Sequence, residues 1–193
     1  DLLPFFPMSN ATAVDAKGSF VIRNLIPARY MPQPEFYARY WYLNSITTAG
    51  TPKIDAAANW TTLKMGAAMD ITISLAEGAA SIRGRVSAAN GASVPSGVGV
   101  YLMPAEREKT ADVLRYFVTT VAADGTFGIN NLPPGRYLSL MQTVDEQTGT
   151  LAKLRLPESL EARAKLRRTA ETQKKDLELK PCQNLTDYAL TLK

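Results

Sequence analysis

The chain contains one sequence motif twice, and this repeat constrains its fold more than any other feature. The copies occupy residues 14–30 and 121–137, so that every position moves by 107 residues (Gly18 to Gly125) without a gap. Both copies follow the pattern Gly-x-Phe-x-Ile-x-Asn-Leu-x-Pro-x-Arg-Tyr. A spacing of this length is that of a small domain rather than of a short solenoid unit.

The motif predicts a turn, a strand, a corner and a second strand. Asp124-Gly125 is a dipeptide typical of tight turns, because glycine adopts positive φ without strain. The alternation that follows predicts a strand with one buried face, and Pro-Pro-Gly predicts the corner. Ala28 replaces this last glycine in the first copy, so its corner must use a different turn or be strained. We assign structural roles to Gly18, Phe20 and Tyr30 in the first copy, and to Gly125, Phe127, Pro134, Gly135 and Tyr137 in the second.

Residues 124–137, which read Asp-Gly-x-Phe-x-Ile-x-x-Leu-Pro-Pro-Gly-x-Tyr, resemble the signature of bacterial carboxypeptidase regulatory-like modules. These are transthyretin-like β-sandwiches, related in shape to the collagen-adhesin B-type repeat and to starch-binding domains. The resemblance implies an all-β fold of two tandem antiparallel β-sandwich (transthyretin-like or Ig-like) modules. It also implies a bacterial protein that is secreted, periplasmic or on the cell surface. It implies no catalytic residue, because the family module is the accessory domain of certain carboxypeptidases.

We expect residues 79–193 to form a complete sandwich module. Pro157 is tolerated at a helix start, and the acidic residues beside it favour the positive helix terminus. A short inserted helix is therefore predicted at about 157–172, with Leu160 and Ala164 on its apolar side. Alternating apolar residues predict strands over 80–87, 98–104, 114–121, 126–130, 137–144, 177–179 and 188–192.

Residues 1–78 form a partial module, because too little chain precedes the first motif copy. The second module has two predicted strands, around 82–86 and 98–102, before its motif. The first has only residues 1–17 there, and it closes with a strand over 71–75 in the place of 188–192. Such a sheet would leave unpaired backbone and an apolar face. We expect a strand from upstream residues or from a neighbouring chain to fill the gap.

The aromatic segment from Phe36 to Tyr42 is the main candidate for a functional site. If the segment is a strand, Tyr37, Arg39 and Trp41 lie on one face, and the other face is aromatic as well. Together with Trp60, these residues would form a platform that stacks on sugar rings. The alternative is that one face fills the core and the other packs on the second module or on a neighbour.

The composition excludes several kinds of enzyme. The chain has no histidine, which removes the usual general base near neutral pH and the commonest transition-metal ligand. Cys182 is the only cysteine, so neither an intrachain disulfide nor a cysteine-rich zinc site can form. Asp15 and Asp124 lack the spacing of a calcium loop. We therefore expect no catalytic residue, no cofactor and no metal.

The chain has a net charge of +4, and much of its positive charge lies in one segment. Acidic residues are interleaved with the basic ones there, which favours a solvated helix face over a surface for an anionic partner. We do not expect nucleic acid as a partner. The basic residues of the segment are Arg163, Lys165, Arg167, Arg168, Lys174 and Lys175.

The sequence thus predicts a non-enzymatic extracytoplasmic structural or interaction module. Its expected partners are other modules of the same polypeptide or neighbouring subunits. It has no run of about 18 apolar residues, so no transmembrane helix is predicted. Two alternatives stay open: a carbohydrate-binding module that uses Tyr37, Trp41 and Trp60, and an accessory domain of an upstream secreted enzyme.

Overall fold

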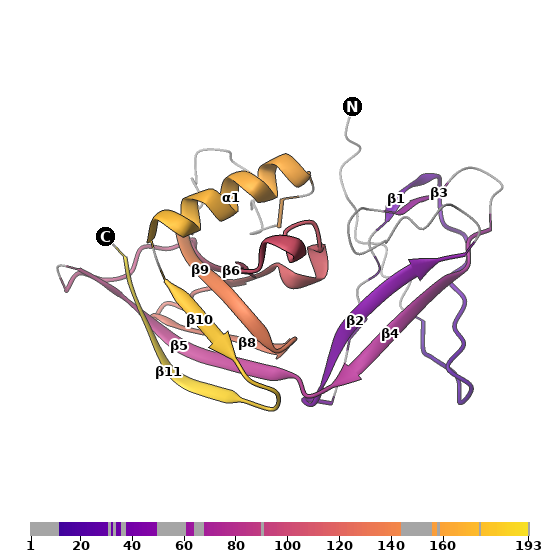
Figure 1. The fold of residues 1–193 in the computed structure, drawn as a ribbon, viewed down its shortest axis with the longest axis horizontal. Coiled ribbons are helices and arrows are strands. Elements are labelled where there is room, and N and C mark those ends of the chain that lie inside the picture. Colours follow the sequence, from indigo (N-terminus) through magenta and orange to yellow (C-terminus); the bar gives the residue numbers. More distant parts are fainter. Residues whose placement is uncertain are drawn as a thin grey trace.

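The C-terminal part of the chain folds into a sandwich of two β-sheets, and a smaller set of strands lies to one side of it (Figure 1). The computed structural model describes residues 12–30, 32, 34–35, 38–49, 61–63, 68–89, 91–143, 156–157, 159–173 and 175–192. Their elements are β1 (Ala28–Tyr30), β2 (Trp41–Thr48), β3 (Thr61–Leu63), β4 (Ile71–Glu77), β5 (Ala80–Ala88), β6 (Val98–Pro104), the short 3-10 helices η1 (Arg107–Lys109) and η2 (Val113–Arg115), β7 (Phe117–Thr120), β8 (Thr126–Leu132), β9 (Gly135–Thr143), α1 (Leu160–Gln173), β10 (Asp176–Leu179) and β11 (Asn184–Leu192).

The sandwich consists of a four-stranded sheet in the order β10-β9-β6-β7 and a three-stranded sheet in the order β11-β5-β8. Strand pairs are antiparallel except for β11 and β5, which run parallel. The predicted all-β sandwich with one short helix is therefore confirmed, with one parallel pair in an otherwise antiparallel arrangement.

The core of the sandwich follows from period-2 alternation along the strands. Phe127 and Ile129 of β8 point inward, as do Tyr137 and Met141 of β9, and all four are buried. Leu138 and Leu140 of β9 belong to a second buried cluster on the outer face of the same sheet. Both faces of the four-stranded sheet are therefore covered, which explains why every residue of β6 is buried.

Helix α1 covers the outer face of the four-stranded sheet (Figure 1). The Ser159 hydroxyl accepts a hydrogen bond from the Ala162 amide at 3.1 Å, a capping contact at the helix start. The buried side chains are Arg163, Leu166 and Ala170, at helical spacing. The predicted apolar side was wrong, because Leu160 is 49% exposed.

The predicted strand over 114–121 begins later than expected. Residues Val113–Arg115 form η2, in which the Asp112 carboxylate accepts a hydrogen bond from the Leu114 amide at 3.0 Å. The strand β7 starts only at Phe117. A local side-chain cap therefore prevails here over the β-branched and aromatic composition.

The described strands of the N-terminal part form two separate ribbons, β1 with β3 and β2 with β4. Strand β4 confirms the strand predicted over 71–75, but it pairs antiparallel with β2, whereas β11 pairs parallel with β5. No strand forms over residues 19–27. Phe20 is only half-buried and Ile22 is 38% exposed, so the expectation that Phe20 and Phe127 are equally buried is wrong.

The two motif copies nevertheless share their local geometry. Gly18 and Gly125 have φ of 82° and 81°. In each copy the turn closes with the same backbone hydrogen bonds, and the tyrosine hydroxyl donates to the carbonyl four residues earlier at 2.7 Å. Those tyrosines are Tyr30 and Tyr137. The copies differ at the corner, where Gly135 has φ of 148° and Ala28 does not have positive φ.

Substitution of Gly84 tests how closely the three-stranded sheet packs. A Cβ at Gly84 would lie 2.1 Å from the Tyr188 carbonyl oxygen and 2.7 Å from the Phe127 ring. We predict that Gly84→Ala lowers the free energy of unfolding by about 3 kcal/mol, the upper end of overpacking costs. In the control Gly128→Ala, the new Cβ makes only ordinary contacts, the nearest at 3.6 Å. Denaturant unfolding should show a gain of roughly 0.5–1 kcal/mol for the control, as for other strand glycines.

Burial of Tyr137 predicts alkaline destabilisation. Desolvation raises the pKa of its phenol from 10.0 to about 12, against the opposing effect of Arg115. The unfolded chain therefore loses this proton first, and stability present below pH 10 falls as the pH rises towards 12. Urea unfolding at a series of pH values should show a smaller loss in Tyr137→Phe than in the unchanged protein. Equal losses in both proteins over this window would contradict the prediction.

Candidate functional site

The two parts of the chain meet at a hydrogen-bonded corner between β4 and β5 (Figure 1). The amides of Gly78 and Ala79 both donate to the Tyr40 carbonyl oxygen, at 2.9 and 3.0 Å. The side-chain amide of Asn131, near the end of β8 in the sandwich, donates to the carbonyl oxygens of Ala38 at 3.0 Å and Trp41 at 2.7 Å. We refer to residues 38–41, 78–79 and 131 as the junction.

The junction includes two residues with special backbone conformations. Gly78 has φ of 94°, which a glycine adopts without strain, and its carbonyl accepts a hydrogen bond from the Cys182 amide at 3.0 Å. Asn131 has φ of 57°, in the left-handed region that asparagine tolerates better than most residues. The junction is thus specified by particular residues on both sides of the connection.

A small apolar cluster makes a second contact between the two parts. Ile46 of β2 is 1% exposed and packs against Val113 and Leu114 of η2. The partly buried Leu43 and Ile73, from β2 and β4, complete the cluster. Together with the hydrogen bonds of the junction, this contact fixes the β2–β4 ribbon against the sandwich.

The structure places part of the predicted aromatic platform at the junction. Trp41 begins β2 and is 36% exposed, while Tyr40 in the preceding turn is 69% exposed. Arg39 lies in the same turn and is exposed. Residues 38–40 of the aromatic segment do not form a strand, because the carbonyls of Ala38, Tyr40 and Trp41 accept hydrogen bonds from Gly78, Ala79 and Asn131 that hold the segment in a turn.

Phe36, Tyr37 and Trp60 lie outside the described residues. Arg39 and Trp41 do not share a strand face, because only Trp41 belongs to a strand. A sugar platform built from Tyr37, Trp41 and Trp60 therefore stays a prediction. What the described residues show is a pair of exposed aromatic side chains whose backbone is held by the junction.

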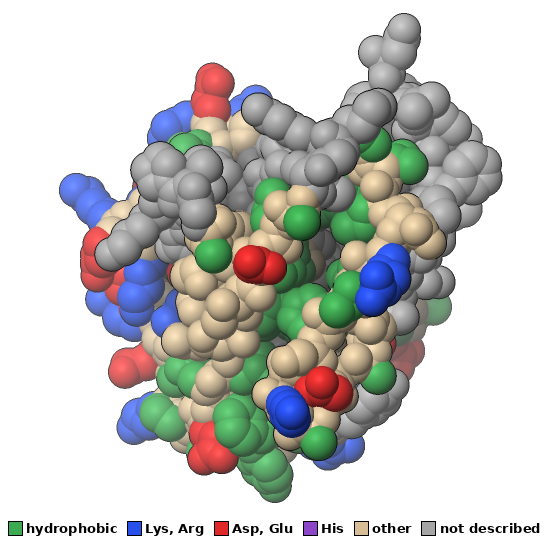
Figure 2. Space-filling model, turned by 90° about the vertical axis from the view of Figure 1, so that its right-hand side faces the viewer, with side chains coloured by type: hydrophobic (Ala, Val, Ile, Leu, Met, Phe, Trp, Pro, Cys, Tyr) green, Lys and Arg blue, Asp and Glu red, His purple; other side chains and the backbone are tan. Residues whose placement is uncertain are grey.

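Exposed apolar side chains concentrate in the N-terminal part. Among the described residues, all exposed large hydrophobic side chains except Leu160 precede Ala79. Figure 2 shows hydrophobic side chains in the middle and at the lower edge of the face that it presents. The exposed residues before Ala79 are Val14, Val21, Ile22, Ile26, Tyr40, Trp41 and Leu75.

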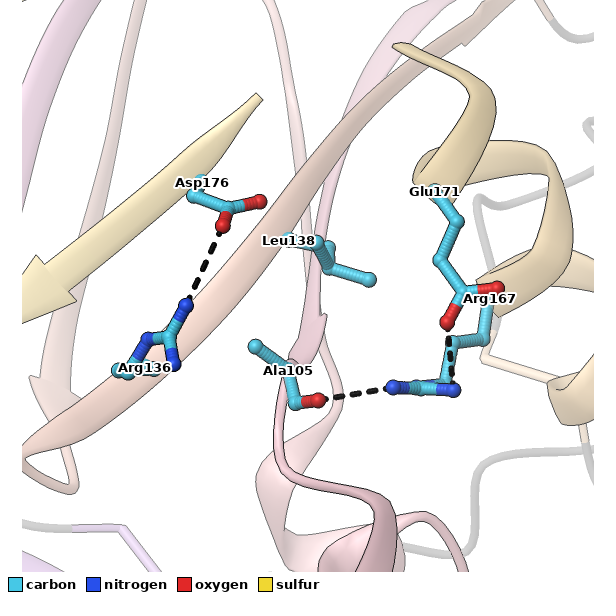
Figure 3. A pocket seen from close by; sticks show the side chains of 6 residues that line it. All are labelled: Ala105, Arg136, Leu138, Arg167, Glu171 and Asp176. Carbon is cyan, nitrogen blue, oxygen red and sulfur yellow. Dashed lines mark hydrogen bonds and ion pairs between the residues drawn. The ribbon is translucent and has the colours of Figure 1, made fainter. Parts of the chain in front are cut away.

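A shallow hollow of about 380 Å³ lies between α1 and the four-stranded sheet (Figure 3). Two ion pairs line it: Arg136 with Asp176 at 3.3 Å, and Arg167 with Glu171 at 2.7 Å. Arg167 also donates to the Ala105 carbonyl at 2.8 Å. The charges of each pair neutralise one another, and the hydrogen bonds of Arg167 to the carbonyls of Pro104 and Ala105 connect the helix to the sheet, so we assign no ligand to the hollow.

The predicted solvated basic face of the helix is wrong for two of its arginines. Arg163 is 0% exposed, lies 5.8 Å from the centre of the Tyr116 ring and donates to the Pro157 carbonyl. Its burial lowers its pKa. Arg167 donates hydrogen bonds to the carbonyls of Pro104 and Ala105 at the end of β6. The spacing of Arg167 and Glu171 was a sequence signal for that ion pair, whereas the burial of Arg163 had none.

The aspartates of the two motif turns accept hydrogen bonds from nearby backbone amides. The Asp124 carboxylate accepts hydrogen bonds from the hydroxyl and amide of Thr126, and these bonds lower its pKa. The Asp15 carboxylate accepts from two amides of the first turn. Among the described residues, no group of three His, Cys, Asp or Glu could hold a metal ion. Cys182 is a free, exposed thiol at φ of 58°.

Comparisons with solved structures give weak matches to two proteins of Bacillus. No protein-family model and no curated protein matches the chain. The Bacillus anthracis TIE protein matches 77% of this chain over 23% of its own, with 16% identity and a TM-score of 0.34. BcpA*(D312A), the major pilin subunit of Bacillus cereus, matches 68% of this chain over 35% of its own, with 11% identity and a TM-score of 0.32. The chain thus spans only a quarter to a third of these proteins.

Within the described residues, no helix is long and apolar enough to cross a membrane.

The junction can be tested with a glycine substitution that keeps the backbone and removes the amide. Asn131→Gly retains positive φ but loses the two hydrogen bonds to the carbonyls of Ala38 and Trp41. We expect it to lower the free energy of unfolding by about 1–3 kcal/mol, since two hydrogen bonds are lost and each contributes about 0.5–1.5 kcal/mol. Asn24, with φ of 59°, is the matched control, because it is exposed in the first copy. Equal losses for Asn24→Gly and Asn131→Gly in urea unfolding would contradict a role for the Asn131 amide.

Proposed function

We propose that the chain is a non-enzymatic structural module of an extracytoplasmic protein, which joins neighbouring modules or subunits. The observation that carries the proposal is the concentration of exposed apolar side chains in the N-terminal part. Soluble proteins rarely expose grouped apolar surface unless a partner covers it. The resemblance of residues 124–137 to carboxypeptidase regulatory-like modules supports the extracytoplasmic location.

The difference in apolar burial between the sandwich and the N-terminal part supports the same function. In the sandwich, the large apolar side chains lie in two buried clusters, one between the sheets and one under α1. The β2–β4 ribbon is attached to this sandwich by the hydrogen bonds of the junction and by the Ile46 cluster. The sandwich then acts as a rigid support that presents the apolar side chains of the N-terminal part to a neighbour.

Sedimentation velocity over a range of protein concentrations tests this proposal. We predict reversible association of the chain, driven by burial of Val21, Ile26 and their neighbours. The variant Val21→Ser/Ile26→Ser should remain monomeric at concentrations where the unchanged chain associates, because both side chains are about 60% exposed and contribute to the contact rather than to the fold. Leu160→Ser removes an exposed leucine of the sandwich and is the matched control, which should associate normally. A chain that is monomeric at every concentration would overturn the proposal.

A further inference from the structure

The first motif copy has the sequence of a strand but does not form one. In the second copy, Thr126–Leu132 is β8 and pairs antiparallel with β5. In the first copy, residues 19–25 belong to no strand, and the described residues provide no backbone hydrogen bond to Phe20–Leu25. The same motif is therefore paired in one copy and unpaired in the other.

Intrinsic β-propensity does not explain the difference. Val21 and Arg23 of the first copy replace Gly128 and Asn130 of the second. Valine favours strands, whereas glycine and asparagine are depleted in them, so the first copy is the better strand former. Local turn geometry does not explain it either, because the turn, the left-handed asparagine and the hydrogen bond of the tyrosine hydroxyl are the same in both copies. The difference between Ala28 and Gly135 lies beyond residues 19–25 and their counterparts. Among the residues that the structure describes, the first copy has no neighbouring strand.

The second copy shows what that neighbour must look like. Ile82 of β5 lies opposite Ile129, and Gly84 lies opposite Phe127. The glycine is required, because a Cβ there would lie 2.7 Å from the Phe127 ring. The same pairing on the first copy would place an apolar residue opposite Ile22 and a glycine opposite Phe20. It would also cover side chains that are now exposed or half-buried.

We propose that residues Ser19–Leu25 are an acceptor site for an added β-strand of the β5 type. Its partner is an extended segment in which alternate residues are apolar and one of them is a glycine, as in the Ile82-Arg83-Gly84 sequence of β5. The strand pairs antiparallel with Phe20–Ile22 through backbone hydrogen bonds, and its side chains give specificity. This inference deepens the proposed function by naming the kind of partner. A second copy does not supply its own β5, because both edges of that strand are occupied by β8 and β11.

A synthetic peptide with the sequence of Ala79–Ala88 is a direct probe of the acceptor site. Added to the full chain, it should bind saturably in calorimetric titration. Amide hydrogen exchange should slow in residues 19–25 and stay unchanged in residues 126–132, where the chain's own β5 is already paired. The peptide with Gly84→Val should bind at least about tenfold more weakly, a factor that a single steric clash readily supplies. A scrambled peptide of the same composition controls for its positive charge.

Variants of the chain locate the site. Phe20→Ala and Ile22→Ser remove side chains that would face the added strand's apolar residues, and each should weaken peptide binding by about tenfold. Leu160→Ser is the control, because it changes an exposed leucine of α1 outside residues 19–25, and it should bind the peptide as the unchanged chain does. Circular dichroism should show the same folded sandwich in all of them, since residues 19–25 lie outside its core.

The outcomes separate this inference from the proposed function. Three results would each overturn the acceptor site. The first is that the Ala79–Ala88 peptide does not bind at all, and the second is that the Gly84→Val and scrambled peptides bind as tightly as it does. The third result is that hydrogen exchange slows only in residues other than 19–25. Self-association in sedimentation without peptide binding would contradict the acceptor site and support the joining function. Peptide binding with protection at residues 19–25 in a chain that stays monomeric would support the acceptor site and contradict the proposed self-association.

Discussion

The close approach of the Phe127 ring to the backbone of Gly84 is the contact on which the three-stranded sheet depends. Phe127 is buried between the two sheets, and a ring in that position leaves no room for a side chain on the central strand opposite. The Tyr188 carbonyl of β11 crowds the same point from the other edge of β5. Three strands therefore meet around one glycine, and the four-stranded sheet packs over them to complete the core.

The two motif copies separate what a local sequence can specify from what it cannot. The turn at the glycine, the left-handed asparagine and the tyrosine corner form in both copies, because their hydrogen bonds connect residues at most four positions apart. The strand between them forms only where β5 lies alongside. A strand cannot satisfy its backbone groups by itself, so its existence depends on a distant partner in a way that a turn does not.

This distinction also accounts for what could be predicted from the sequence. Period-2 patterning located the strands of the sandwich, and the motif identified its corner. The same patterning failed over residues 19–23, where no described strand is available for pairing. The aromatic segment forms no strand at residues 38–40, where hydrogen bonds from Gly78, Ala79 and Asn131 hold a turn. The helix was located by its proline and acidic start. Its buried face was not, because a buried Arg163 over the Tyr116 ring has the composition of a surface position.

The junction gives the motif asparagine a second use, which no local pattern reveals. Asn131 has a left-handed backbone near the end of β8, and its side-chain amide donates to two carbonyls of the preceding part of the chain. One residue of the sandwich thus attaches the neighbouring ribbon. Asn24 has the same backbone conformation, but its exposed side chain forms no such contact with the described residues. The first motif copy therefore presents, next to an unpaired strand sequence, the same amide that the second copy uses to hold its neighbour.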